Sequence, residues 1–432
     1  MIGIGLGMVG CPRRLVWTPA QLAPGRLAFW SDRTIAGVAS ATNGTGAVTG
    51  LDDTSKAAWL ADLSANAIPL IQGTGASQPI VGYSALGRGI ALIADGGQSL
   101  IGGSALSGVR HIYAAVTFSG SPVPVTSVVP DPFATEAMTI ASTSGAVADT
   151  HSLLVGLTAQ QLWTSGGLSG PAYVNGVNTL NVGYPNLRKV IRFSRSNNVT
   201  TGALNVFQSS GGALPARAIV HQLACTTAAT SEEDHANLAA YFDWHLAAPV
   251  VACSVDSLTA GLGLTTRQGY PWLLHRNRWR GCVSVPNLGL VGQTMASALI
   301  NDPAKLASVK GTGKNIIVLL GGVNDIAGGA TAATVWGRLK AYIAAAKAEG
   351  WQVVICSPPA CPGRPEAERD EILALRTLIA AEWDSELVGA AAYVDLYPLS
   401  LVRQGDGVHF TSSDCQTVAN EIGPAVDTLL AA

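Results

Sequence analysis

The pattern of apolar residues changes at Pro249, and this change limits the folds open to the chain more than any other feature. After Pro249, uninterrupted apolar stretches alternate with longer amphipathic ones. Strands that are apolar at every position are buried on both faces, which is typical of a parallel sheet covered by helices. The apolar stretches are VVACSV (250–255), NIIVLLGG (315–322), WQVVICSP (351–358) and AAYVDLYP (391–398).

The stretches between these strands favour helices. Residues 332–350 and 365–383 have the apolar spacing of amphipathic helices, and residues 413–430 are predicted to form a last helix. Strand and helix therefore alternate along this part of the chain. We predict that residues 249–432 form one α/β domain with a parallel sheet and helices on both of its faces.

Residues 25–248 follow another pattern. Short apolar stretches alternate with Gly, Ser, Asn and Pro turns, which is typical of an all-β sandwich. Near the end of this part, residues 231–247 are predicted to be helical, with Ser231 as N-cap and acidic residues in the first turn. Examples of the apolar stretches are HIYAAVTF (111–118), HSLLVGL (151–157) and KVIRF (189–193).

The composition bounds the classes of partner. A chain of 432 residues is too long for one ordinary core, which agrees with two domains. Charged residues make up 12% of the chain, the formal net charge is −2, and clusters of Lys or Arg do not exceed local pairs. A nucleic-acid partner is therefore not expected. The apolar stretches also fall short of the ~20 residues of a membrane-spanning helix, so insertion into a membrane is not expected.

Residues 1–24 form an apolar, glycine-rich leader. A secretory signal begins with positive charge, whereas in MIGIGLGMVGCPRRL the charge follows the apolar run. We therefore expect synthesis in the cytoplasm without a signal peptide. Gly5, Gly7 and Gly10 have the spacing of a dinucleotide-binding loop but lack the strand before it and the helix after it. No nucleotide cofactor is expected.

The seven cysteines are scattered along the chain. They form no CxxC pair, and no histidine lies at zinc-ligand spacing from them, so no metal site is expected. We expect buried or half-buried free thiols. Cys356 and Cys361 flank the sequence SPPA, and a local disulfide between them is the alternative.

Polar residues that can carry chemistry follow the predicted parallel strands. Ligands of such sheets bind at the carboxyl ends of the strands, so these residues are expected to meet in one cleft. They occur in the segments Asp256-Ser257, NLGLVG (287–292), GGVND (321–325) and DGVH (406–409).

In order, spacing and strand context, these four segments resemble the SGNH, or GDSL-type, hydrolases, a superfamily of esterases and lipases. The resemblance covers roughly residues 250–432 and implies a three-layer, flavodoxin-like α/β fold. It also implies a catalytic serine, a glycine, an asparagine and an Asp-x-x-His pair. The corresponding residues of this chain are Ser257, Gly292, Asn324, Asp406 and His409.

Elementary chemistry supports these roles. A serine hydroxyl is a poor nucleophile until a base removes its proton, which is the expected role of His409. Asp406 can then fix the tautomer of the imidazole and stabilise the imidazolium. The oxyanion of the tetrahedral intermediate needs preorganised donors. We expect the backbone N–H groups of Ser257 and Gly292 and the side-chain amide of Asn324.

These residues also have alternative interpretations. Ser257 could be the N-cap of the helix that follows it, and His409 could be a solvent-facing loop residue. Asn324 and Asp325 could end their strand as turn residues. Asp325 is expected to be a structural hydrogen-bonding partner rather than a catalytic acid.

The sequence also allows expectations for Val255 and His275. Val255 stands where the family's first segment usually has glycine. It could continue the strand with its Cβ buried behind Ser257, or tilt the turn and displace the nucleophile, which reduces catalysis. His275, in LLHRNRW, is expected to be a surface residue of a helix.

The first domain resembles the concanavalin A-like and laminin-G-like jelly rolls over roughly residues 25–247. The resemblance implies a sandwich that binds glycans, in some members with calcium. Its aromatic residues can stack on sugar rings or pack in the core, so no sugar-binding residue is assigned. The matching pieces include LAFWSD, QGTGASQP (72–79), YVNG (173–176) and the closing strand, loop and helix.

With a domain of each kind, the chain resembles phage tail-associated carbohydrate esterases. This resemblance implies a serine esterase that removes O-acetyl or other short acyl groups from a bacterial surface polysaccharide, without a metal. Residues 1–24 would then dock the protein onto other tail proteins of a virion. One alternative is a receptor-binding tail protein without turnover, and another is a lipase or thioesterase. A homo-oligomer is open, although no coiled-coil heptads indicate one.

Overall fold

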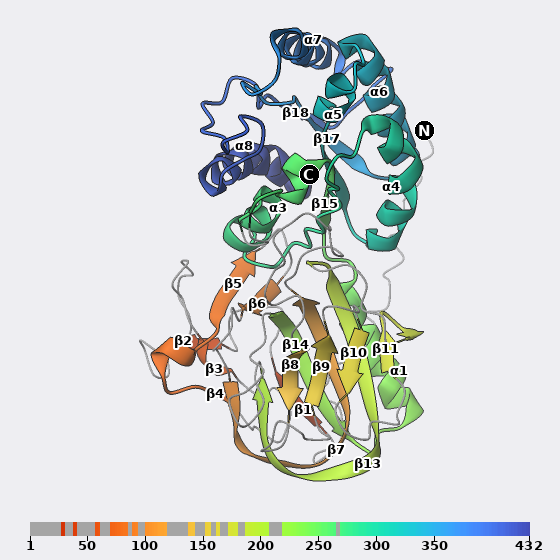
Figure 1. Ribbon diagram of the computed structural model, residues 1–432. Coiled ribbons are helices and arrows are strands. Elements are labelled where there is room, and N and C mark those ends of the chain that lie inside the picture. Colours follow the sequence, from red (N-terminus) through yellow and green to blue (C-terminus); the bar gives the residue numbers. More distant parts are fainter. Residues whose placement is uncertain are drawn as a thin grey trace, which may run out of the picture.

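The computed structural model (Figure 1) describes residues 27–30, 38–40, 57–60, 70–84, 89–93, 100–118, 137–142, 152–156, 161–164, 172–179, 186–206, 218–264 and 268–432. Antiparallel strands make up most of the described residues before residue 228, and the part after residue 249 is a helix-covered parallel sheet. The leader, residues 1–24, lies outside the described residues, and so do several other stretches before residue 218.

The sheet of the C-terminal part is parallel, as predicted. Its strands run in the order β15 (Val250–Val255), β16 (Asn315–Leu320), β17 (Gln352–Cys356) and β18 (Ala392–Val394). All residues of β15 and β16 are buried, in agreement with their fully apolar sequences. On the other side of β15, residues 284–287 make isolated parallel bridges, Val250 to Ser284 and Cys253 to Asn287.

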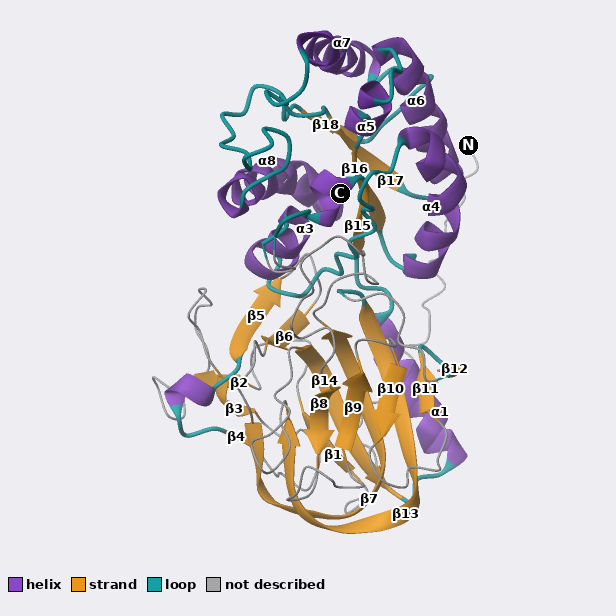
Figure 2. Cartoon of the chain, in the orientation of Figure 1, coloured by secondary structure: helices purple, strands orange, loops and turns teal. Residues whose placement is uncertain are grey.

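Helices cover both faces of this sheet (Figure 2). Helices α3 and α8 pack together on one face, and α4 and α6 pack together on the other. The predicted helices over 332–350, 365–383 and 413–430 are confirmed. The helices of this part are α2 (Ser257–Ala260), α3 (Tyr270–Leu273), a π-helical turn (Leu274–Arg278), α4 (Met295–Val309), α5 (Val323–Ala327), α6 (Ala332–Ala348), α7 (Glu366–Glu382) and α8 (Ser412–Ala431).

The first part of the chain forms an antiparallel sheet around three long strands, β7 (Leu100–Phe118), β13 (Arg188–Val206) and β14 (Ala218–Thr227). The described strands belong to one hydrogen-bonded sheet, and the jelly-roll arrangement stays a prediction. The others are β1 (Leu27–Trp30), β2 (Val38–Ser40), β3 (Ala57–Leu60), β4 (Leu70–Ile71), β5 (Ile80–Ser84), β6 (Gly89–Ile93), β8 (Ala137–Ser142), β9 (Ser152–Gly156), β10 (Gln161–Thr164), β11 (Ala172–Val174) and β12 (Val177–Asn178), with a 3₁₀ turn at Gly75–Ser77.

The helix predicted before Pro249 is confirmed as α1 (Glu232–Phe242), followed by a 3₁₀ turn (Asp243–His245). Ser231 is its N-cap, and its hydroxyl and the Asp234 carboxylate form a reciprocal capping box. Leu238 and Phe242 pack against Tyr113 of the sheet.

Buried contacts join the two parts of the chain. The backbone N–H of Arg188 donates to the Ser284 hydroxyl at 3.0 Å, and its guanidinium donates to the Cys282 carbonyl. The Val285 N–H donates to the Asn186 carbonyl at 2.9 Å. Burial lowers the pKa of Arg188 to about 10. The segment 282–285 therefore carries β15 on one side and the antiparallel sheet on the other.

His275 is not a surface residue, and that prediction was wrong. The π-helical turn is packed under residues 279–283, so the imidazole is fully buried and its Nδ1 donates to the Val283 carbonyl at 2.8 Å. Burial lowers the pKa of His275 to about 4, and the ring is neutral at ordinary pH. The pattern LLHRNRW indicated a helix, but the burial depends on a later segment folding back over it.

The cysteines in the described part of the chain are buried and form no disulfide, as predicted, so the alternative of a Cys356–Cys361 disulfide is wrong. Within that same part, no helix has the length and apolarity to cross a bilayer. Nor do three His, Cys, Asp or Glu side chains of the described ranges gather closely enough to hold a metal ion.

Candidate active site

Ser257 lies at the carboxyl end of β15, in the first position of the short helix α2. The residue before it, Asp256, is the N-cap: its Oδ1 accepts the Leu258 N–H at 2.9 Å. The interpretation of Ser257 as a helix cap is therefore wrong. Its side chain, on a residue that is 6% exposed, instead lies 2.9 Å from the Nε2 atom of His409.

His409 and Asp406 lie in the loop between β18 and α8. The Asp406 Oδ2 atom lies 2.5 Å from Nδ1 of His409, and its Oδ1 accepts the N–H groups of Val408 and His409 at 2.9 and 3.0 Å. Because Nδ1 donates to the carboxylate, Nε2 is free to accept the proton of the serine hydroxyl. Asp406, His409 and Ser257 thus form one chain of hydrogen bonds.

The environment keeps Asp406 ionised. Partial burial by itself raises its pKa, but the hydrogen bonds from the His409 ring and from the two N–H groups outweigh that effect. Together they lower the pKa of Asp406 to about 2. The carboxylate can therefore hold the imidazole in one tautomer over the whole neutral range.

Gln404 holds this loop in place, a role that the sequence analysis did not foresee. Its side-chain amide donates to the Leu262 carbonyl at 2.7 Å and to the Phe410 carbonyl at 2.6 Å. Its own N–H donates to the His409 carbonyl at 2.8 Å. Gln404 therefore ties the histidine loop to the segment just after Ser257, although the two segments lie far apart in the sequence.

The structure also brings the Gly292 segment beside Ser257 and Asn324. The Leu290 N–H donates to the Val255 carbonyl at 3.0 Å, and Asn324 Nδ2 donates to the Gln293 carbonyl at 3.1 Å. Gly292 has a φ of +74°, a left-handed conformation that favours glycine, and the space beyond its Cα is open. These positions are compatible with the predicted oxyanion donors, whose role stays a prediction.

Gly289 is a second residue that was missed. A Cβ atom there would lie 2.5 Å from the Ala260 nitrogen and 2.8 Å from the Asp256 carbonyl oxygen. Glycine is therefore needed for this segment to pack directly on the turn that carries Ser257. Asn287 strengthens the same contact, since its Nδ2 donates to the Thr259 carbonyl at 3.0 Å. The two glycines in NLGLVG were the sequence feature that could have indicated this role of Gly289.

Val255 does continue the strand, with its side chain fully buried and paired in register with Leu320. Its φ of +122°, however, is a conformation that β-branched residues rarely adopt, and such strain costs about 1–3 kcal/mol. The turn keeps the backbone shape of glycine while carrying a valine side chain. Ser257 nevertheless remains within hydrogen-bond distance of His409.

Two buried carboxylates lie behind the nucleophile. Asp325 accepts the Met295 N–H at 2.7 Å and pairs with Arg338 at 2.6 Å, in agreement with its predicted structural role. Asp256 is fully buried, and within the described residues its Oδ2 has no hydrogen-bond partner. Burial, with a smaller contribution from Asp325, raises the pKa of Asp256 to about 7.

Comparison with known families matches residues 256–414 to the GDSL-like Lipase/Acylhydrolase family. The matched range contains Ser257, Gly292, Asn324, Asp406 and His409. A comparison with curated proteins found no match. The family match supports a GDSL-type acylhydrolase domain in this part of the chain, and that family implies ester hydrolysis.

Solved structures of similar proteins include the psychrotrophic esterase EstA from Pseudoalteromonas sp., at 16% identity and a TM-score of 0.35, covering 42% of this chain and 99% of that one. Another is an acetyl xylan esterase, AlAXEase, at 19% identity and a TM-score of 0.35, covering 41% of this chain and 99% of that one. A third is Axe2, an acetylxylan esterase from Geobacillus stearothermophilus, at 14% identity and a TM-score of 0.34, covering 41% and 93%.

The strained φ at Val255 predicts an inverted order of stability. We expect Val255→Gly to be more stable than Val255→Ala by about 1 kcal/mol, since alanine keeps the left-handed strain and glycine does not. At Val318, a buried residue of the neighbouring strand with ordinary backbone angles, the order should be the usual one, with alanine more stable. Denaturant unfolding of the four variants measures this, and glycine being the less stable at both positions would contradict it.

The raised pKa of Asp256 predicts a pH-dependent stability. Between about pH 4 and pH 7 the folded protein holds a proton that the unfolded chain has lost, so the fold loses stability as the pH rises through that range. Asp256→Asn keeps the acceptor for the Leu258 N–H but cannot ionise. We expect it to be more stable than the parent at pH 8, by on the order of a few kcal/mol, and little different at pH 4. A stability difference that is constant with pH would contradict the assignment.

Proposed function

We propose that this protein is a serine esterase that removes O-acetyl or other short acyl groups from a bacterial surface polysaccharide. The observation that carries the proposal is the continuous hydrogen-bond chain from Asp406 through His409 to Ser257. A hydroxyl, an imidazole oriented by an ionised carboxylate, and an adjacent loop with a left-handed glycine are the parts that acyl transfer needs.

Acylation begins when the Ser257 Oγ attacks the ester carbonyl carbon while His409 Nε2 accepts the hydroxyl proton. The imidazolium that forms is stabilised by Asp406, which stays ionised because its pKa is low. The negative charge moves to the former carbonyl oxygen. There the N–H groups of Ser257 and Gly292 and the Asn324 amide would donate to it.

Collapse of this intermediate breaks the bond between the carbonyl carbon and the sugar oxygen. His409 gives its proton to that oxygen, the glycan leaves with a free hydroxyl, and the acyl group remains on Ser257. In the second half, His409 removes a proton from water, and the resulting attack on the acyl-serine releases acetate and restores the hydroxyl.

The polysaccharide part of the proposal rests on the first domain, whose sequence resembles glycan-binding jelly rolls. That domain is joined to the esterase domain through the buried contacts at Arg188 and Ser284. The virion part rests on the apolar leader, which we propose docks onto other tail proteins. The alternative, a receptor-binding protein with a decayed site, is disfavoured because Val255 leaves the Ser257–His409 contact intact.

Ser257→Ala tests the nucleophile. We expect the parent to release acetate from p-nitrophenyl acetate and from acetylated bacterial polysaccharide, and the variant to lose at least about 10³-fold in kcat. Ser308→Ala, at an exposed hydroxyl near the end of α4, is the matched control and should keep full activity. Absence of hydrolysis by the parent on every ester would favour the receptor-binding alternative.

Asn324→Ala tests the oxyanion role. Loss of one such donor lowers kcat by roughly 10²–10³-fold, and KM should change little because the donor acts on the charge of the transition state. Asn277→Ala, at an exposed amide of the same domain, serves as control. An unchanged kcat in Asn324→Ala would contradict the oxyanion role, and the Asn324 side chain would then have only a structural role through its hydrogen bond to Gln293.

A further inference from the structure

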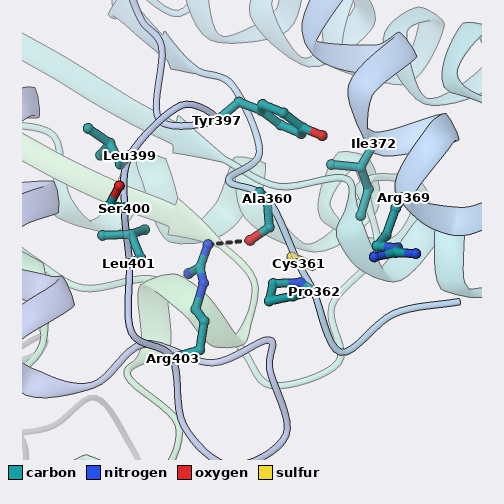
Figure 3. Close-up of a pocket in the computed structure, with 10 residues that line it drawn as sticks. All are labelled: Ala360, Cys361, Pro362, Arg369, Ile372, Tyr397, Leu399, Ser400, Leu401 and Arg403. Carbon is teal, nitrogen blue, oxygen red and sulfur yellow. Dashed lines mark hydrogen bonds between the residues drawn. The ribbon is translucent and has the colours of Figure 1, made fainter. Parts of the chain in front are cut away.

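The loop that carries His409 is tied to the segment after β17. Arg403, in that loop, donates from its guanidinium to the Ala360 carbonyl at 2.5 Å, beside a cavity of about 290 Å³ (Figure 3). Gly292 does not line this cavity. The Gly292 segment (residues 290–293), which is predicted to bind the oxyanion, therefore has to be held in another way, since oxyanion donors must be preorganised.

The Gly292 segment is a tight turn held by hydrogen bonds at its end. The Gln293 N–H donates to the Leu290 carbonyl at 3.2 Å, with Gly292 in its left-handed conformation between them. The Gln293 carbonyl accepts the Asn324 side-chain amide at 3.1 Å. Gln293 therefore joins the two predicted donors at 292 and 324, and a displacement of Gln293 would move both of them.

The side chain of Gln293 ends on a buried carboxylate. The residue is 5% exposed, and its Nε2 atom donates to Oδ1 of Asp302 at 2.8 Å. Asp302 lies in α4 and is completely buried. A carboxylate only accepts hydrogen bonds, so Gln293 has to turn its NH₂ group toward it. Because Oε1 of Gln293 has no partner within the described residues, the bond to Asp302 is the one that fixes this amide.

Asp302 joins this turn to the strand of the nucleophile. Its Oδ2 accepts the Ser254 hydroxyl at 2.6 Å and the Tyr342 hydroxyl at 3.0 Å. Its Oδ1 also accepts the Lys305 ammonium at 2.9 Å, so that four donors use both oxygens of the carboxylate. Ser254 lies in β15, three residues before Ser257.

The pairing of Asp302 makes this arrangement rigid. A carboxylate accepts shorter and stronger hydrogen bonds than a neutral group does. The partly buried Lys305 ammonium pairs with it and offsets the cost of burying its charge. Burial and the charge of Asp302 raise the pKa of Tyr342, so its hydroxyl remains a donor. One buried carboxylate therefore fixes α4, α6, β15 and the Gly292 segment relative to one another.

We propose that Asp302 is a positioning residue for ester hydrolysis. Through Gln293 it sets where the Gly292 N–H and the Asn324 amide lie relative to the nucleophile. The inference rests on the proposed esterase function and adds to it a residue that is too buried to touch the substrate. Displacing such donors by about 1 Å can lower catalysis about 10²-fold. Because the donors act on the charge of the transition state, Asp302 should affect kcat rather than KM.

Gln293→Met tests the link, since methionine is similar in length to glutamine but donates no hydrogen bond. We expect kcat on p-nitrophenyl acetate to fall about tenfold while KM stays within about twofold of the parent value. Asp427→Asn is the matched control. It alters another carboxylate of the domain, which lies in α8 and accepts Arg278 and Trp279, and it should leave kcat unchanged even where it lowers stability. An equal fall in both variants would overturn the proposal.

Exchange of the two side-chain groups is the sharper test. Gln293→Glu places a second carboxylate against Asp302, so we expect it to lower kcat as Gln293→Met does. Adding Asp302→Asn re-forms the bond with donor and acceptor exchanged and restores the net charge of the pair. The double variant should therefore recover kcat to within about threefold of the parent, at unchanged KM. If the two substitutions add their losses instead, Asp302 has only a structural role.

A measurement without substrate separates this inference from the esterase proposal. In nuclear magnetic resonance spectra of the full chain with isotope-labelled asparagine, the side-chain signal missing from Asn324→Ala belongs to Asn324. Gln293→Met should move that signal toward the position of a free amide, and Asp427→Asn should not. If Ser257-dependent hydrolysis occurs but Gln293→Met changes neither the signal nor kcat, the Asp302 inference fails and the esterase stands. If the signal moves but the parent cleaves no ester, the esterase proposal fails instead.

Discussion

The parallel pairing of β15 with β16 is the constraint on which the site depends. The two strands align from Val250 opposite Asn315 to Val255 opposite Leu320, and every residue in them is buried. Burying an aliphatic side chain of this kind stabilises the fold by about 1.5–3 kcal/mol, so neither strand can slip without a large loss. Since both faces of the sheet are covered, polar chemistry is confined to the loops at its carboxyl edge. Ser257 and Asn324 both lie there.

Two aspartates near Ser257 have opposite pKa shifts because their environments differ. The side chain of Asp406 is 48% exposed and accepts three hydrogen bonds, so its pKa falls to about 2. Asp256 is fully buried, one of its oxygens has no hydrogen-bond partner among the described residues, and its pKa rises to about 7. The first is suited to stabilising an imidazolium, and the second to capping the nucleophile's helix in neutral form. Sequence spacing cannot distinguish them, because the difference arises from burial.

Continuous apolar strands and helical spacing were sufficient to predict the C-terminal sheet, its main helices and the residues that meet at its edge. The features that these patterns did not predict depend on packing between segments that lie far apart in the sequence. His275 is buried by a later segment, and Gln404 contacts Leu262 across the fold. In the first part, β7 extends over LIGGSALSG, whose glycines and serines favour turns, because β13 pairs with it along that length. Local propensity is overridden there by hydrogen bonds to a distant strand.

The backbone strain at Val255 is tolerated because the neighbouring residue, Gly321, has no side chain. A Cβ atom at Gly321 would lie 2.7 Å from the Val255 Cγ1 atom, so the valine occupies space that a side chain at position 321 would need. Gly321 lies directly after β16, opposite the end of β15. The packing of a buried isopropyl group can therefore offset a φ of +122° only while position 321 stays glycine. The two positions are one structural unit, in which a side chain fits at 255 or at 321 but not at both. This explains how a chain can depart from glycine before Ser257 and still place that hydroxyl against His409.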